Sequence, residues 1–326
     1  MTTLTTAMRV GTLTAVALLA TAAASHGWAQ TFPSRPITII VPFAAGGGTD
    51  IATRAVATLM GKQLNTSFVV DNRPGGNSFI GATAAARAAP DGYTLFMTSL
   101  TTHSINPHVF RSLPYALSDF VPVGFLAATL PVLITQSGNP ANNVRDVINQ
   151  AAAKPGGLNF AVPNASSRFA TEMFSLMAKT KVTSINYNST PQAHAEVVSG
   201  RIDYIFGDFS AGGGLIESGK LKALAVAGSK RLSMFPNIPT LAESGLPGVE
   251  VEIWAGLFAP KGTAPEVVDK VNAAMNTALK DPQVRDIFLK GAQDSRAMSP
   301  AEFGRYVDGQ YQHWGQMVKT LNIQPE

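Results

Sequence analysis

One stretch constrains the fold of this chain more than any other. The apolar run Ile37–Val41 leads into Gly46-Gly47-Gly48-Thr49-Asp50, and a helical pattern follows. The run is continuous and largely β-branched, which is typical of a buried strand. Glycines let backbone amides approach a ligand closely, and Thr49 or Asp50 can cap the following helix, whose free N–H groups attract carboxylate or phosphate. The stretch predicts a strand–loop–helix unit with an anion site, although a plain glycine-rich connection has the same pattern.

Strand and helix patterns alternate in two sets along the chain. The expected strands are Ile37–Val41, Phe68–Val70, Thr94–Thr98, Val132–Thr135, Leu158–Val162, Val182–Tyr187, Ile202–Phe206, Leu221–Ala227 and Val249–Phe258. Expected helices include Phe79–Ala88, Val144–Ala153, Phe169–Ala178, Ala193–Val198 and Val267–Leu279. The alternation in the first set predicts a parallel sheet with right-handed crossovers, and the second set predicts a second α/β lobe. We expect one lobe from residues 30–131 and 251–326, a second lobe from 132–250, and two crossover strands that form a hinge.

The N-terminal segment has the layout of an export signal. Arg9 precedes an apolar segment, Val10–Ala24, and small residues end at Ala29. We expect residues 1–29 to be a cleaved signal peptide, because the apolar segment is shorter than the roughly 20 residues of a membrane span. The chain contains no cysteine, so no disulfide holds the exported fold.

Charge and motifs exclude several classes of function. The net charge of +4 comes without any run of Lys and Arg, which argues against nucleic-acid binding. A phosphate loop needs a Lys after its last glycine, and Ile51 stands where a dinucleotide fingerprint needs its third glycine. The histidines lack zinc-site spacing, and no Gly-x-Ser-x-Gly elbow is present. We therefore expect no cofactor, no metal and no catalytic residue.

Polar segments follow several of the expected strands. Ligands of open α/β sheets bind at the carboxyl ends of the strands, so these segments are candidate binding loops. They contribute Ser99, Thr101 and His103 after the third strand, and then Asn164, Ser166, Ser167, Arg168, Tyr187, Asn188 and Asp208. The segment before the Phe169 helix repeats the arrangement of the glycine loop, which favours a binding role. Asp208 has an equally supported alternative role, which is to cap the next turn.

From about Phe32 to the C-terminus the chain resembles the periplasmic solute receptors of tripartite tricarboxylate transporters, also called Bug receptors. The resemblance rests on Pro33-Ser34-Arg35-Pro36-Ile37, Val41-Pro42-Phe43 with Gly46–Asp50, Asn72-Arg73-Pro74-Gly75, Pro90–Leu95, Leu113-Pro114-Tyr115, Gly219–Val226, Pro239–Gly245, and Trp254 with Ala259–Thr263. It implies a two-lobed, type II periplasmic binding fold in a Gram-negative periplasm. Such a monomer closes on a small carboxylic acid, such as a di- or tricarboxylate or an aromatic acid, and delivers it to membrane permease subunits.

The chain departs from the family pattern on one side of the expected cleft. The family usually has a glycine-rich loop ending in His-Leu before the Phe169 helix, and here Arg168 stands at the histidine position. Where the family usually has Tyr-Lys-Gly, this chain has Tyr187-Asn188-Ser189. One hypothesis is that Arg168 makes a bidentate bond to the second carboxylate of a diacid or to an aromatic acid. The alternative is that Arg168 points outward to solvent.

The expected ligand contacts come from both lobes. They are Phe43, Gly47, Gly48, Thr49, Asp50, Ser99, Thr101, His103, Asn164, Ser166, Ser167, Arg168, Tyr187, Asn188 and Asp208. The ligand carboxylate is expected on the amides of Gly47, Gly48 and Thr49 and on the loop opposite. Two other classes of function fit the same cleft: a periplasmic oxidoreductase or hydrolase, and a sensor receptor that signals to a kinase.

Overall fold

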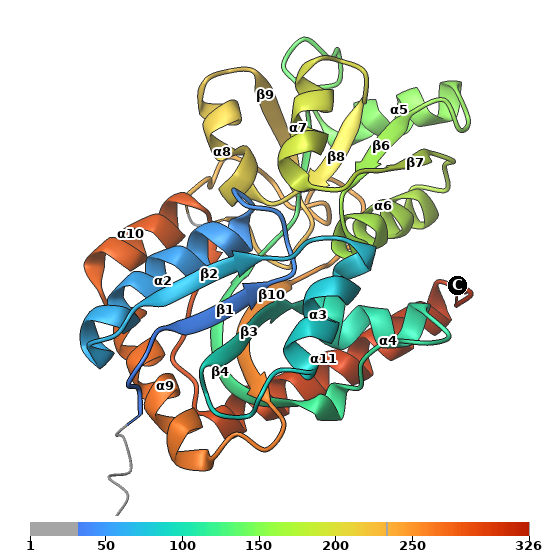
Figure 1. The fold of residues 1–326 in the computed structure, drawn as a ribbon. Coiled ribbons are helices and arrows are strands. Elements are labelled where there is room, and N and C mark those ends of the chain that lie inside the picture. The colour runs from blue at the N-terminus through green and yellow to red at the C-terminus, as the bar shows by residue number, and fades with distance from the viewer. Residues whose placement is uncertain (1–31, 233, 326) are drawn as a thin grey trace, which may run out of the picture. The chain divides into compact units, whose positions relative to one another are not determined.

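The computed structural model describes residues 32–232 and 234–325. The expected signal peptide, residues 1–29, lies outside the described residues. From Arg35 onward the chain forms one compact unit, in which two β-sheets, each flanked by helices, make two lobes (Figure 1). None of the helices described has the length and apolar character that a membrane crossing requires.

The first sheet has six strands in the order β11-β4-β10-β3-β1-β2. Their bounds are β1 Ile37–Val41, β2 Phe68–Asn72, β3 Thr94–Ser99, β4 Phe120–Thr129, β10 Ile253–Pro260 and β11 Gln293–Asp294. Helices α2 (Gly48–Leu64) and α9 (Pro265–Ala278) pack together against one face, whereas α3 (Phe79–Ala86) and α11 (Pro300–Thr320) cover the other. Gly256 lets the Phe303 ring of α11 lie directly on β10, where a Cβ would overlap the ring.

The second sheet has five strands in the order β7-β6-β8-β5-β9. Their bounds are β5 Val132–Gln136, β6 Asn159–Val162, β7 Thr183–Asn186, β8 Tyr204–Gly207 and β9 Leu221–Val226. Side chains alternate between two apolar clusters, so that α5 (Val144–Ala153) and α6 (Ala165–Met177) cover one face and α7 (Thr190–Val198) and α8 (Phe209–Glu217) cover the other. The remaining helices are α4 (Asn106–Val109) and α10 (Pro282–Lys290), with short turns at Gly76–Ser78, Thr101–Ile105 and Leu117–Asp119.

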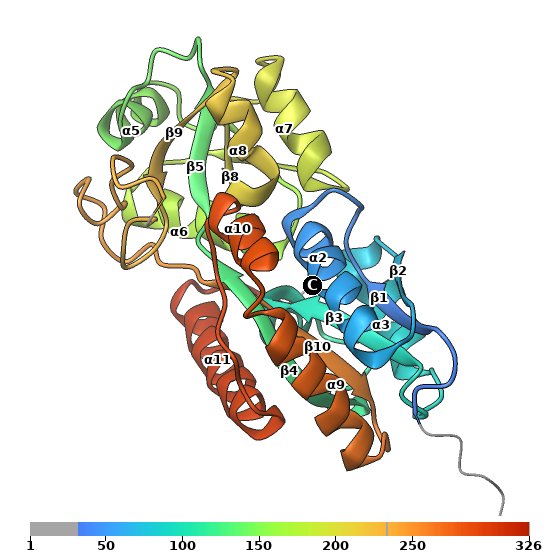
Figure 2. The ribbon, with the colours of Figure 1, turned by 90° about the vertical axis from the view of Figure 1, so that its left-hand side faces the viewer.

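The chain passes between the sheets in two places. It leaves β4 at Thr129 and enters β5 at Val132, as Figure 2 shows, and it returns through residues 227–252 into β10. The strands of the first set, β1, β2 and β3, are parallel as expected. The strands at the crossings are antiparallel to their neighbours: β5 to β8 and β9, and β10 to β3 and β4. The physical reason is that a strand arriving straight from the other lobe lacks the helical crossover that makes neighbouring strands parallel.

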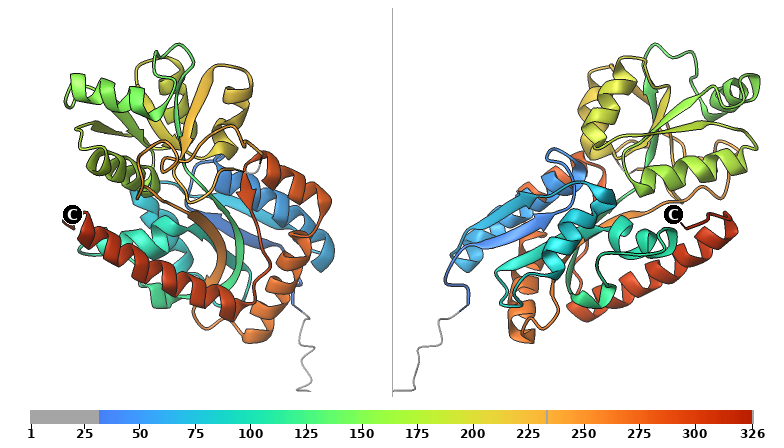
Figure 3. Two further views of the ribbon diagram at one scale, coloured as in Figure 1. Left: turned by 180° about the vertical axis from the view of Figure 1, so that it is seen from behind. Right: turned by 45° about the vertical axis from the view of Figure 1, so that its right-hand side comes forward.

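The lobes also touch beside the crossings. Helix α11 lies along the lobe of the first sheet, and α6 of the second sheet lies over its C-terminal part (Figure 3). There the rings of Phe169 and Trp314 meet edge to face with centroids 5.1 Å apart, and each side chain is at most 1% exposed. This contact continues the apolar core from one lobe into the other.

Candidate functional site

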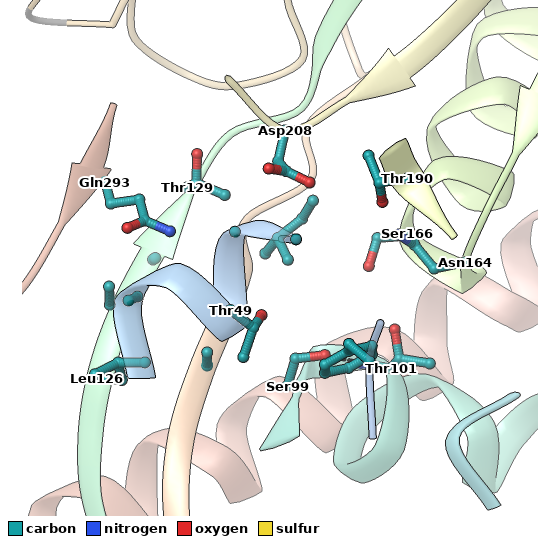
Figure 4. Close-up of a pocket in the computed structure, with 18 residues that line it drawn as sticks. Thr49, Ser99, Thr101, Leu126, Thr129, Asn164, Ser166, Thr190, Asp208 and Gln293 are labelled. Atoms are coloured by element: carbon teal, nitrogen blue, oxygen red, sulfur yellow. Dashed lines mark hydrogen bonds between the residues drawn. The ribbon is translucent and has the colours of Figure 1, made fainter. Parts of the chain in front are cut away.

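An open cavity of about 660 Å³ lies where the carboxyl ends of parallel strands from both sheets meet. Figure 4 shows its lining side chains gathered around one space, with Thr49 and Ser99 below and Asp208, Thr190 and Ser166 above. Nine of the fifteen expected contacts line it: Phe43, Gly47, Gly48, Thr49, Ser99, Thr101, Asn164, Ser166 and Asp208.

The glycine loop presents the start of α2 to this cavity. Gly46 has a φ of 81°, which suits glycine, and Gly47 is the N-cap of α2 without any side-chain cap bond. The first helical bond runs from Ile51 N to Gly47 O, and the N–H of Gly47 itself is donated to Ala44 O at 3.3 Å. Among the hydrogen bonds of the described residues, none is donated by the N–H groups of Gly48 and Thr49. The amide donors are thus Gly48 and Thr49, and the expected Gly47 amide is engaged within the loop.

Asp50 holds this loop from behind and does not line the cavity. Its carboxylate is 3% exposed and accepts from Gly46 N at 3.0 Å, from Arg54 Nε at 2.9 Å and from Asn72 Nδ2 at 2.9 Å. Burial alone would raise the pKa of Asp50, but the hydrogen bonds from Arg54, Gly46 and Asn72 outweigh it and hold that pKa below its usual value. Asp50 therefore positions the glycine loop as an anion.

The start of α6 faces the same space from the second lobe. Asn164 caps α6 by accepting from Ser167 N at 2.9 Å, and Ser166 follows it into the cavity. The hydroxyl of Ser167 donates to Phe206 O at 2.6 Å, which ties α6 to β8 and turns this side chain away from the cavity. Ser167, expected as a ligand contact, is placed instead as a connection within the lobe.

Two further helices of the second lobe begin at the cavity. Helix α7 is capped by Ser189 and places Thr190 in the lining, and α8 is capped by Asp208, which accepts from Ala211 N at 3.0 Å. With α2 and α6, four helix N-termini converge there. Each carries a partial positive charge of about half an elementary charge, so the cavity favours an anion although none of its lining residues is Lys, Arg or His.

His103 lies outside the cavity, against the expectation that it faces the cleft. Its ring is 2% exposed and stacks on Phe258 with centroids 4.1 Å apart, and Phe120 lies at 5.3 Å. The reason is that Thr101–Ile105 forms a helical turn, which points Thr101 into the cavity and His103 into the aromatic core. Burial lowers the pKa of His103 to about 3, so the ring is neutral near pH 7.

Three expected contacts of the second lobe also lie outside the lining. Arg168 is half-buried and its Nη2 donates to Asn186 Oδ1 at 2.9 Å, at the end of β7. Tyr187 is half-buried against the apolar cluster beneath α7 and α8, and Asn188 is exposed. The structure therefore gives Arg168 a partner on its own lobe.

Other lining residues were not expected from the sequence. They are Ala52, Leu126, Ala127, Ala128, Thr129, Thr190, Ile253, Ala255 and Gln293. A signal existed for Thr190, because it opens a helix directly after a strand, and for Thr129, because it precedes an expected crossing. Gln293 had none, since β11 is two residues long and reaches the site only by pairing with Thr129.

Within the described part of the chain, no group of three or more His, Asp or Glu side chains is placed to hold a metal ion. The cavity lining offers hydroxyls, amides and one carboxylate. Its chemistry is that of hydrogen bonding to a small polar ligand.

Comparisons with known proteins agree with this geometry. The sequence model of the family described as tripartite tricarboxylate transporter family receptor matches residues 52–323. Protein BugT of Bordetella pertussis is 32% identical over 295 residues, covering 89% of this chain and 90% of BugT. A protein of R. palustris solved with adipate is 30% identical with a TM-score of 0.88, covering 90% of this chain and all of that one. MatC from Rhodopseudomonas palustris with bound malate is 30% identical with a TM-score of 0.83, covering 88% of this chain and all of MatC.

Proposed function

The chain belongs to the tripartite tricarboxylate transporter receptor family, and we propose that it captures a small carboxylic acid between its lobes for such a transporter. The observation that carries the proposal is the pair of helix starts facing each other across the cavity: Gly48 and Thr49 on α2, and Asn164 and Ser166 on α6. Their amides and hydroxyls suit a carboxylate that gains by being enclosed from both sides. Relatives of the same fold bind adipate and malate, which supports an acid as the ligand.

The proposed cycle is closure followed by delivery. The crossings β4–β5 and 227–252 act as the hinge, and the acid stabilises the closed form because only that form places both helix starts on it. Permease subunits then recognise the closed, monomeric receptor in the periplasm. The chain reaches that compartment through a signal peptide cut after Ala29, and it catalyses no reaction.

A ligand screen tests the proposal. The full chain, expressed with its own N-terminal segment and purified from the periplasm, is heated in the presence of aliphatic, hydroxylated, amino-substituted and aromatic acids. A true ligand at 100 times its dissociation constant stabilises the protein by about 2.7 kcal/mol. A sugar or a metal ion that stabilises the protein where every acid fails would overturn the proposal. N-terminal sequencing of the same sample checks cleavage after Ala29.

A further inference from the structure

Asp208 is the one ionisable side chain in the cavity. Figure 4 draws the 18 lining residues, and all the others are neutral: glycine, alanine, apolar, hydroxyl or amide side chains. In that view the carboxylate of Asp208 points down into the space above Thr49. A negative charge in this position is unexpected in a site that takes a carboxylate.

Capping alone does not account for this charge. Asp208 accepts from Ala211 N at 3.0 Å and so caps α8. The two neighbouring helices that begin at the cavity, α6 and α7, are capped by the neutral residues Asn164 and Ser189. Because Asn and Ser cap helices about as well as Asp, a neutral residue would serve α8 equally.

The charge of Asp208 acts directly on an acidic ligand. Two carboxylates about 5 Å apart at the edge of a protein interior repel each other enough to weaken binding roughly a hundredfold. The imidazole of His194 interacts with Asp208 but is not a positive counter-charge near neutral pH. His194 packs beneath the site, where a Cβ on Gly207 would lie 2.6 Å from its Nε2, and its burial lowers its pKa although Asp208 raises it, so the ring stays neutral.

We propose that the ligand is an amino-substituted carboxylic acid whose ammonium group binds Asp208 while its carboxylate binds the start of α2. A hydroxyl group on the ligand needs only a neutral acceptor oxygen, such as those of Asn164 and Ser189. An ammonium group on the ligand is different, because the negative charge of Asp208 attracts it. A carboxylate accepts about four hydrogen bonds, so Asp208 can accept from an ammonium group in addition to capping α8. This inference rests on the proposed function, because it names which acids the same cavity prefers.

The test compares acids that differ only in the amino group. Titration calorimetry on the protein purified from the periplasm measures L-aspartate against succinate, L-glutamate against glutarate, and L-phenylalanine against 3-phenylpropionate. In at least one pair the amino acid is expected to bind tenfold or more tighter. Putrescine, an amine without a carboxylate, is expected not to bind.

Asp208→Asn isolates the charge, since Asn retains the size and the capping ability of Asp. The variant is expected to lose at least tenfold in affinity for the preferred amino acid, whereas its deaminated partner should bind more tightly because the repulsion is removed. Asn164→Asp is the matched second variant. It adds a carboxylate at the neighbouring cap and is expected to weaken the deaminated acid more than the amino acid.

The outcomes separate the two proposals. If unsubstituted acids bind more tightly than amino acids, or if Asp208→Asn leaves the ratio unchanged, the role of Asp208 is refuted while the acid receptor stands. If no acid of either series binds, the receptor function fails and this inference fails with it. Should Asp208→Asn not fold, the ratio measured in Asn164→Asp decides, and an equal loss for both acids would overturn the inference.

Discussion

Removing the Asp50 carboxylate should both destabilise the protein and loosen its ligand loop. The buried carboxylate accepts from Gly46 N, Arg54 and Asn72. Hydrogen bonds to a charged group contribute about 1.5–3 kcal/mol each, but Arg54 is 48% exposed, so its ion pair adds at most about 1 kcal/mol. Allowing for non-additivity, we expect Asp50→Ala to lower the free energy of unfolding by about 3 kcal/mol, or the melting temperature by about 5 °C.

Thermal unfolding and calorimetric titration with the best acid measure the two effects. The affinity should fall because Gly46 loses its tether and the amides of Gly48 and Thr49 lose their fixed direction. Asp286→Ala is the matched control: Asp286 and Lys290 form an i,i+4 pair as Asp50 and Arg54 do, but both side chains are more than half exposed. That control should leave the free energy of unfolding almost unchanged, because water screens the pair. Equal small effects of the two substitutions, with unchanged affinity, would refute the role assigned to Asp50.

Three further predictions follow from other parts of the molecule. The pKa of His103 is about 3 in the folded protein against 6.5 in the unfolded chain, so its contribution to stability is fully present above pH 6.5 and is lost as the pH falls toward 3. Between pH 7 and pH 5 the free energy of unfolding, measured with urea, should therefore fall by about 2 kcal/mol on account of His103. His103→Phe should remove that part of the fall. Gly256→Ala should cost roughly 1–3 kcal/mol because its methyl would overlap Phe303, whereas Gly309→Ala, with open space around it in α11, should stabilise by roughly 0.5–1 kcal/mol; similar melting temperatures would contradict this. Arg168→Ala should change the affinity for acids by less than about twofold, because the Arg168 guanidinium donates to Asn186. A tenfold loss of affinity confined to diacids would instead indicate that Arg168 contacts the ligand when the lobes close.

The local pattern of apolar residues was sufficient to predict the bounds of some helices and strands. The strand Ile37–Val41 and the helix Val144–Ala153 have the bounds that their apolar spacing predicts. The longest strand, β4, was not expected, because Pro122 and Gly124 interrupt its apolar run. Both are tolerated for tertiary reasons: the pairing of β4 with β10 shifts register there, and Gly124 gives room to Asn272 and Met275 of α9.

The site was predictable in its loops but not in its side-chain directions. Strand ends followed by helix starts predicted Gly48, Asn164 and Asp208 at one site, and all three line the cavity because carboxyl ends of parallel strands share one edge. Whether a polar side chain in such a loop faces the cavity depends on contacts with distant residues, as His103 with Phe258 shows. Composition and spacing carry no information about those contacts.

A crystal structure of the protein with its best-binding acid tests the central claim most directly. We predict the ligand carboxylate within about 2.7–3.2 Å of the amide nitrogens of Gly48 and Thr49, with the start of α6 closing over it. An acid bound outside the cavity, or one whose carboxylate pairs with a lysine or arginine and leaves those amides to water, would contradict the account.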